Sequence, residues 1–228
     1  MNYKFCSLLR ADLHYRREAF DKGLKAVGFT PSDERQCDVL LIWNRYGRFE
    51  ASADAVEARG GRVIVAENAT WGNGFLGGKW LSVWPHLHNR ADSIRYGGPG
   101  RWDDMGVPLM DWRSGGERVG LGQRGIGPRG TPKNWAPRNV DRVRKHPGVG
   151  VCIPLELDLA KAGTVVTWGS GAAVKALMWG IRVESHMPKW CGEQDNTDQG
   201  RIEMFRRLAW AQWTLSEIES GEPFARLL

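Results

Sequence analysis

Residues 164–183 read TVVTWGSGAAVKALMWGIRV and indicate the fold class more clearly than any other segment. An apolar run of strand length ends at the break Gly169-Ser170-Gly171, and a helical run follows over 172–179. A second short strand, IRVES, occupies 181–185. Strand, turn, helix and strand in this order form the repeating unit of a parallel sheet covered by helices. The stretch therefore predicts an α/β fold.

The first third of the chain shows the same alternation. Apolar residues fall at helical spacing over 15–27, and 49–58 reads as a second helix. CDVLLIWN at 37–44 and RVIVAEN at 62–68 are continuous apolar runs, which are typical of parallel strands buried on both faces. A second parallel α/β layer is therefore predicted near the N-terminus.

Two layers imply two lobes. We predict an N-terminal Rossmann-like lobe over 1–112 and a C-terminal Rossmann-like lobe over 113–198. The end of the chain has apolar residues on one helical face, so 199–228 is predicted to contain a long amphipathic helix that packs across the lobes. The pattern dissolves over 69–113, and so long an irregular span is expected to carry function.

Composition excludes several classes of protein. Of 228 residues, 42% are apolar and 25% charged, which is ordinary for a globular protein. No run approaches the roughly 20 apolar residues of a membrane span, and early charges exclude a secretory signal, so the expected location is the cytoplasm. The four cysteines lack any CxxC spacing, so we expect reduced thiols rather than a zinc site or disulfides.

Positive charge is concentrated in one stretch. Residues 113–147 carry nine basic side chains against two acids, a local excess larger than the +6 of the whole chain. Such a patch suits nucleotide phosphates or a nucleic-acid backbone, or it is a solvated basic loop. The basic residues are Arg113, Arg118, Arg124, Arg129, Lys133, Arg138, Arg142, Arg144 and Lys145.

The glycine-flanked serine is the first candidate site. Glycines at 169 and 171 let the backbone approach a ligand without interference from a Cβ atom, and the following helix begins with unpaired N–H groups. Ser170 either caps that helix or donates its hydroxyl to a phosphate. The stretch contains neither GxxxxGK[ST] nor GxGxxG.

Two further polar motifs also follow predicted strands. Gln123-Arg124 and His146-Pro147 each come directly after a strand, as Ser170 does. Because ligands of doubly wound sheets bind beyond the carboxyl ends of the strands, these three loops are predicted to converge on one crevice. Loop tryptophans add faces on which a base or a sugar could stack. They are Trp71, Trp80, Trp84, Trp102, Trp112 and Trp135.

The order of QRGIG, RKHPG, TWGSG and GIRV resembles the donor half of capsule-type Kdo transferases. These bacterial glycosyltransferases use a CMP-linked sugar and have two Rossmann lobes of the GT-B type. The resemblance implies that 1–112 is the acceptor lobe and 113–198 the nucleotide-donor lobe. VAENATWGNGFLGGKWLSVWPHLHNRAD is similar to the glutamate-containing segment of that family, and RLAWAQWTLSEIESG resembles the end of uncharacterised tailed-phage proteins.

The resemblance implies roles for particular residues. Glu67 and His146 would be catalytic. The donor and its phosphate would be held by Gln123, Arg124, Pro147, Thr167, Gly169, Ser170 and Gly171. Candidates on the acceptor side are His88, Asn89, Trp71 and Asp103, the last as an alternative carboxylate to Glu67.

We therefore expect a reduced GT-B-like glycosyltransferase that moves a sugar from a nucleotide sugar to a hydroxyl, without metal or other cofactor. The acceptor would be a hydroxymethylated base of phage DNA, bound through 113–147 in the host cytoplasm, or a glycan. His86 and His88 lack a third ligand, so no metal site is predicted. The alternative is a phage protein that binds a nucleotide or nucleic acid without catalysis.

Overall fold

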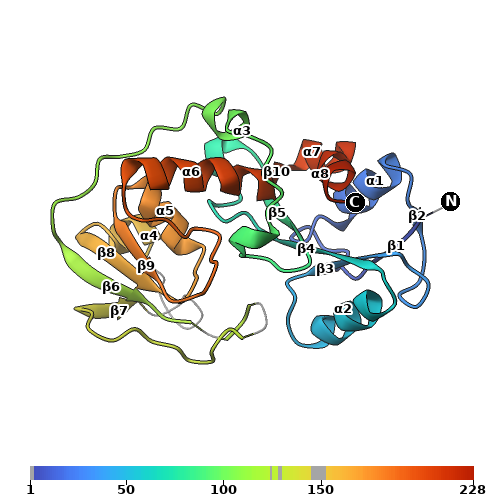
Figure 1. Cartoon of the computed structure of the whole chain (residues 1–228), viewed down its shortest axis with the longest axis horizontal. Coiled ribbons are helices and arrows are strands. Elements are labelled where there is room, and N and C mark those ends of the chain that lie inside the picture. The colour runs from blue at the N-terminus through green and yellow to red at the C-terminus, as the bar shows by residue number, and fades with distance from the viewer. Residues whose placement is uncertain (1–2, 124, 128–129, 145–152) are drawn as a thin grey trace. The chain divides into compact units, whose positions relative to one another are not determined.

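The computed structural model describes residues 3–123, 125–127, 130–144 and 153–228 and is shown in Figure 1. The chain forms two compact units, each with its own sheet. The first consists mainly of Met1–Tyr96 and Trp210–Leu228, and the second of Gly97–Ile126 and Gly130–Ala209. One sheet is mixed and the other entirely parallel, which confirms the α/β class.

The first unit is built on a six-stranded sheet in the order β10-β5-β4-β3-β1-β2. β1 to β4 are parallel to one another. β5 runs antiparallel to β4, and β10 runs antiparallel to β5. The elements are β1 (Lys4–Ser7), α1 (Arg17–Ala26), β2 (Thr30–Pro31), β3 (Val39–Trp43), α2 (Arg48–Ala58), β4 (Arg62–Asn68), the 3₁₀ turns Phe75–Gly77 and Ala91–Ser93, β5 (Trp80–Pro85), β10 (Gln212–Thr214), α7 (Leu215–Ser220) and α8 (Glu222–Leu227).

Helices cover both faces of this sheet. α1, α7 and α8 lie on one face and α2 on the other (Figure 1). The core on the α1 face joins alternate residues of the strands, such as Phe5 and Leu41, to Phe20 and Leu24 of α1 and to Trp213. This alternation follows from the period of two along a strand, and it fixes which side chains of each strand face α1.

Gly23 lets α1 pack closely against α7 and α8. A Cβ atom at this position would lie 1.9 Å from the carbonyl oxygen of Ile218 and 2.7 Å from Cε2 of Phe224. Gly23→Ala should therefore destabilise the unit by about 2 kcal/mol, although alanine favours helices, because the backbone of α7 must move. Urea unfolding measures the change; Gly74→Ala, where no atom lies within 4 Å, is the control and should be nearly neutral.

The second unit has a fully parallel four-stranded sheet in the order β7-β6-β8-β9. Aromatic packing secures two of its helices, since Trp102 of α3 stacks on Phe205 of α6 with ring centroids 4.5 Å apart. The elements are α3 (Gly100–Asp103), β6 (Glu117–Leu121), β7 (Arg142–Arg144), α4 (Leu155–Asp158), β8 (Ala162–Thr167), α5 (Ala172–Met178), β9 (Arg182–Ser185) and α6 (Asp198–Leu208), with a 3₁₀ turn at Ala209–Ala211.

In both sheets the strand order reverses at the first parallel strand of the unit. In each unit the first parallel strand lies between the second and the third: β1 between β2 and β3, and β6 between β7 and β8. Loops that leave such a pair of strands turn to opposite sides and open a crevice at their carboxyl ends. The structure therefore has one switch point at β1/β3 and another at β6/β8.

The predicted C-terminal helix is divided. α6 ends at Leu208, and β10 then pairs with β5 before α7 begins. Thr214 starts α7 with a capping box, because its hydroxyl accepts from the backbone of Glu217 and the Glu217 carboxylate accepts from Thr214. β10 covers the edge of β5 with hydrogen bonds, which a continuous helix could not do. The prediction of one long amphipathic helix within 199–228 was wrong.

The span 69–113 is also more ordered than predicted. It contains β5, whose six residues are buried except for half-buried Pro85. Gly97–Ile126 belongs to the second unit, whereas the sequence placed the division at 112. The glycines and prolines on either side of Trp80–Pro85 obscured a strand whose partners lie far away in the sequence.

Candidate functional site

The switch point of the second unit brings two of the predicted loops together. Leu121 at the end of β6 lies opposite Thr167 at the end of β8. Gln123 follows the first strand and the turn 168–171 follows the second, so both leave the same edge of the sheet. Thr167, Gly169, Ser170 and Gly171 thus share an edge with Gln123, as the strand order requires.

Most backbone N–H groups of the serine turn are used within the turn. Thr167 Oγ1 accepts from the amides of Gly169 at 3.2 Å and Ser170 at 2.9 Å. Ser170 Oγ in turn accepts from the amide of Ala172 at 3.3 Å. The N-cap residue of α5 is Gly171, and the Ser170 hydroxyl binds the first amide of the helix from one residue earlier. The amides of Gly169, Ser170 and Ala172 therefore already have acceptors within the protein, which does not fit the prediction that they hold an anion. The hydroxyl hydrogen of Ser170 remains a donor, because the hydrogen bond to Ala172 uses only a lone pair.

The glycine at 169 is required by packing within the protein. A Cβ atom there would lie 2.6 Å from Sδ of Met187 and 3.3 Å from Cδ1 of Trp190. Both neighbours are buried. We expected the missing side chain of Gly169 to leave room for a ligand. The space is instead occupied by Met187 and Trp190, which follow β9.

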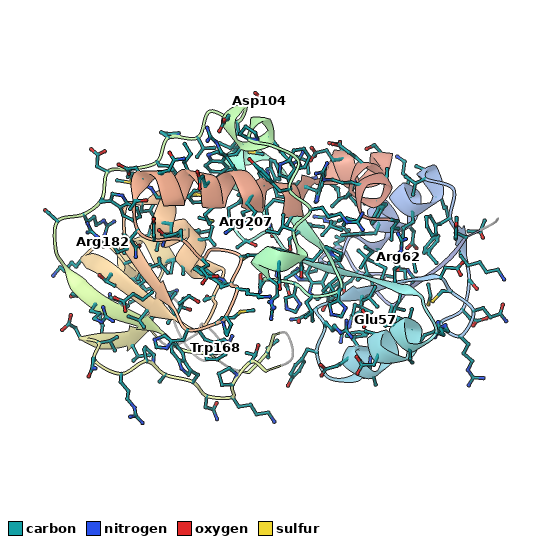
Figure 2. The ribbon with its side chains drawn as sticks, in the orientation of Figure 1. Glu57, Arg62, Asp104, Trp168, Arg182 and Arg207 are labelled. Atoms are coloured by element: carbon teal, nitrogen blue, oxygen red, sulfur yellow. The ribbon has the colours of Figure 1, made fainter. Side chains whose placement is uncertain are left out.

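An aromatic cluster lies at the same edge of the sheet. Trp168 follows β8, His186 follows β9, and Trp135 is joined to Gln123 by a β-bridge with a 2.9 Å hydrogen bond. Ring centroids lie 6.1 Å apart for Trp135 and Trp168 and 5.3 Å apart for Trp135 and His186. The two tryptophans are half-buried and the histidine is exposed. Figure 2 labels Trp168. Such a cluster offers ring faces to a planar ligand.

Three predicted residues lie outside the described residues. They are Arg124, His146 and Pro147. β7, the strand that precedes His146 and Pro147 in the chain, pairs with β6 and ends at Arg144 opposite Leu121. The structure thus places the loops after β6 and β8 at the same edge of the sheet, and the convergence of all three loops on one crevice stays a prediction.

Glu67 belongs to the first unit and lies one residue before the end of β4. Its Oε1 accepts from the backbone N–H of Asn68 at 3.0 Å and from Asn68 Nδ2 at 3.3 Å. Burial raises the pKa of this carboxyl, and the two hydrogen bonds offset only part of the rise. A half-buried carboxylate with a raised pKa is a stronger base than an exposed one.

The acceptor-side candidates of the first unit do not gather around Glu67. Glu67 lies opposite Ser82, whereas β5 ends at Pro85, which lies opposite Ile64. The chain therefore leaves for His88 and Asn89 at the other edge of the sheet. His88 is 1% exposed, and burial lowers its pKa to about 4.

Trp71 and Asp103 have structural partners. The Trp71 ring is buried, stacks on Phe75 at 4.8 Å and meets the edge of Trp80 at 5.4 Å, so it offers no open face to a sugar. Asp103 belongs to the second unit and forms a two-pronged ion pair with Arg206, at 2.9 and 2.8 Å. Neither fits the predicted contact with an acceptor.

Much of the predicted basic surface is neutralised. Arg118 forms a two-pronged ion pair with Glu184 at 2.5 Å, and Arg142 bonds Glu117 and Asp158. Arg144 also pairs with Asp158, and Arg113 donates to three backbone carbonyls. Lys133 and Arg138 are exposed, whereas Arg124, Arg129 and Lys145 lie outside the described residues. Most of the described arginines in this stretch therefore form ion pairs or hydrogen bonds within their own unit.

Reasoning from the sequence missed Trp168 and His186, which stand immediately after the ends of β8 and β9. Their position directly after buried strands was the available signal. In the part of the chain that the structure describes, no three His, Cys, Asp or Glu side chains cluster as a metal site. Nor does this part contain a helix both long and apolar enough to cross a bilayer.

Comparison with known proteins adds no relative. No protein-family model matches the chain, and no curated protein matches it. Its function is therefore argued from the site alone.

Proposed function

We propose that this protein is a glycosyltransferase that uses a nucleotide sugar, and that its second unit holds the donor nucleotide. The observation that carries the proposal is the aromatic cluster at the switch point of the parallel sheet, where Trp168 and His186 follow adjacent strands beside Gln123. Nucleotides bind at this position in doubly wound sheets.

The cluster suits the base of the nucleotide. A base stacked on an aromatic ring gains about 1–3 kcal/mol, and the amide of Gln123 suits a polar base edge or a ribose hydroxyl. Ser170 lies next to Trp168 on the same turn and has a hydroxyl to donate to a phosphate oxygen. The remaining phosphate charge would be met by His146 and Arg124, which the sequence places after neighbouring strands.

The transfer breaks the bond between the anomeric carbon and the phosphate oxygen and forms a bond from that carbon to the acceptor oxygen. The acceptor hydroxyl loses its proton to a carboxylate, and the nucleotide leaves with the electron pair of the broken bond. We assign the carboxylate to Glu67. Within the described part of the chain its Oε2 has no hydrogen-bond partner, and burial makes the group a better base.

The acceptor in this proposal is a sugar or other small hydroxyl compound. The arginines at 113, 118, 142 and 144 are held by carboxylates and carbonyls of their own unit, which leaves less free charge for a DNA backbone than the sequence indicated. DNA binding through phosphates would weaken steeply with salt, so a salt titration with duplex DNA separates the two kinds of acceptor.

Removing the stacking face should weaken nucleotide binding. We expect Trp168→Leu to raise the Kd for CMP, CDP or UDP about tenfold, because one stacking interaction is lost, and Ser170→Ala to raise it a few-fold. Isothermal titration calorimetry with the full chain measures both. Matched controls lie near the other edge of the same sheet: Trp179→Leu at the end of α5 and Ser114→Ala before β6 should bind like the wild type.

Two results would count against this function. If none of the nucleotides binds, or if Trp179→Leu weakens binding as much as Trp168→Leu, the donor site is not at this edge. If nucleotides bind but mass spectrometry shows no transfer from a panel of CMP-, CDP- and UDP-sugars to any hydroxyl acceptor, the protein is a nucleotide-binding protein without catalysis.

A further inference from the structure

A small pocket lies in the first unit, at the carboxyl edge of its sheet. It has a volume of about 120 Å³, and its polar lining consists of His14, Arg16, Asn73 and Lys79. His14 and Arg16 lie in the segment that follows β1, and Lys79 precedes β5, which runs antiparallel to β4. The three basic side chains thus come from the edge where parallel α/β sheets bind ligands.

The cations of this pocket lack acidic partners. In the described part of the chain neither the Arg16 guanidinium nor Lys79 Nζ forms an ion pair or a hydrogen bond, and neither does the His14 ring. Nearby basic residues behave differently: Arg17 pairs with Asp21, and Lys22 pairs with Glu219. Arg16 and Lys79 line the pocket without acidic partners and are left to attract an anion.

The neighbouring acid does not fill the pocket. Asp12 directs Oδ1 to the backbone amides of His14 and Tyr15, at 3.0 and 3.4 Å, where it holds the loop after β1. His14 also packs against Trp43, with ring centroids 5.2 Å apart. The loop that carries His14 and Arg16 is therefore anchored to β3, across the switch point from β1.

The opposite wall is equally fixed. Asn73 accepts from the amide of Ala69 at 2.8 Å and donates to Asn68 Oδ1 at 2.7 Å. Trp80 and Leu81 form the apolar lining of the pocket and are 7% and 4% exposed. An anion placed against such a surface interacts more strongly with the neighbouring cations than it would in open water.

Backbone strain marks the position of Arg16. Its φ is +50°, a left-handed conformation that residues other than glycine adopt at a cost. Glycine would occupy this position without strain. An arginine thus occupies a position where its backbone conformation is unfavourable, and its guanidinium has no partner among the described residues.

We propose that this pocket binds the phosphate or carboxylate group of a small anionic ligand through Arg16, Lys79 and His14. Its volume of about 120 Å³ suits one such group. Under the proposed transferase function, on which this assignment of the ligand rests, the group belongs to the acceptor, which is then a phosphorylated or acidic sugar. The pocket itself is independent of nucleotide binding in the second unit.

Direct binding tests the pocket. Inorganic phosphate and glucuronate are titrated into the full chain at low salt by calorimetry, and the two probes distinguish a phosphate from a carboxylate ligand. We expect saturable binding of at least one, weakened tenfold or more in Arg16→Gln and in Lys79→Gln. Lys25→Gln removes the same charge from an exposed position of α1 and should leave the affinity unchanged.

Arg16→Gly separates binding from folding. This variant should lose affinity for the anion as Arg16→Gln does, while its thermal midpoint stays at or above that of the wild type because the strain at φ +50° is relieved. Absence of binding by both probes, or an equal loss in Lys25→Gln, would overturn the proposal. CMP binding measured in Arg16→Gln reports separately on the second unit, so failure of the pocket and failure of the donor site are distinguishable.

Discussion

Glu67→Gln should lower the rate of sugar transfer about 100-fold or more while leaving the protein folded. The proposed role of the carboxylate is to remove the proton of the acceptor hydroxyl, and a positioned general base contributes about 10²–10⁴-fold to such a step. Glutamine keeps an Oε1 that accepts from the backbone and side chain of Asn68, so the local hydrogen bonds persist. The variant is nearly isosteric, but it cannot accept the proton.

The pH dependence provides a second readout. Burial raises the pKa of Glu67, so the folded state is relatively destabilised as pH rises above the ordinary value of 4.5, and Glu67→Gln removes this cost. We therefore expect the variant to be at least as stable as the wild type at pH 7. The acid limb of the rate profile should lie above pH 4.5 and disappear in the variant.

Steady-state rates by mass spectrometry of the glycosylated acceptor, together with nucleotide titrations, check this prediction. Glu222→Gln, an exposed glutamate of α8 in the same unit, is the control and should transfer at the wild-type rate. A Glu67→Gln variant with undiminished turnover would show that another group takes the proton. Transfer lost together with nucleotide affinity would point to a folding defect instead.

Acidification from pH 7 to pH 4 should cost the first unit about 3 kcal/mol through His88 alone. Its imidazole is 1% exposed, Nδ1 has no partner among the described residues, and burial lowers its pKa from 6.5 to about 4. The unfolded chain takes up the proton below pH 6.5, whereas the folded chain resists it until about pH 4. The contribution of neutral His88 to the free energy of unfolding is therefore fully present above pH 6.5 and is lost as the pH falls from 6.5 to about 4.

Urea unfolding at several pH values, compared between the wild type and His88→Leu, isolates this contribution. The slope of the unfolding free energy against pH should be smaller in the variant between pH 6.5 and pH 4.5. Carboxylates such as Glu184, whose pKa its ion pair with Arg118 lowers, act below that range. Parallel curves for the two proteins would contradict the prediction, as would an NMR titration of the His88 ring with a midpoint near 6.5.

Periodicity was a reliable guide to local structure. The strand predicted at 62–68 is β4 with the same bounds, and the helices predicted at 49–58 and 172–179 are α2 and α5 within one residue at each end. These segments have continuous apolar runs or apolar residues at helical spacing, and their neighbours in the sheet are close in the chain. Local pattern and tertiary structure agree there, so the pattern sufficed.

Distant partners defeated the same reasoning. β10 forms because Gln212–Thr214 meets the edge of β5, about 130 residues earlier, although 199–220 has helical spacing. Trp71 stands among glycines like a loop residue, but Phe75 and Trp80 bury its ring. The arginines of 113–147 predict a free basic surface, but in the folded chain Arg118 pairs with Glu184 and Arg142 with Asp158.

The α/β class, the parallel strands and the loops that follow their ends could be predicted from the order of residues, because strand and helix periods are properties of consecutive residues. Which side chains at those ends are available to a ligand depends on the folded chain. Burial, ion pairing and hydrogen bonding depend on residues that are remote in the chain. The Ser170 turn satisfies its own amides, and Trp168 and His186 meet Trp135 at the edge of the sheet. Arg16 and Lys79, 63 positions apart in the chain, line one pocket because β1 and β5 belong to the same sheet.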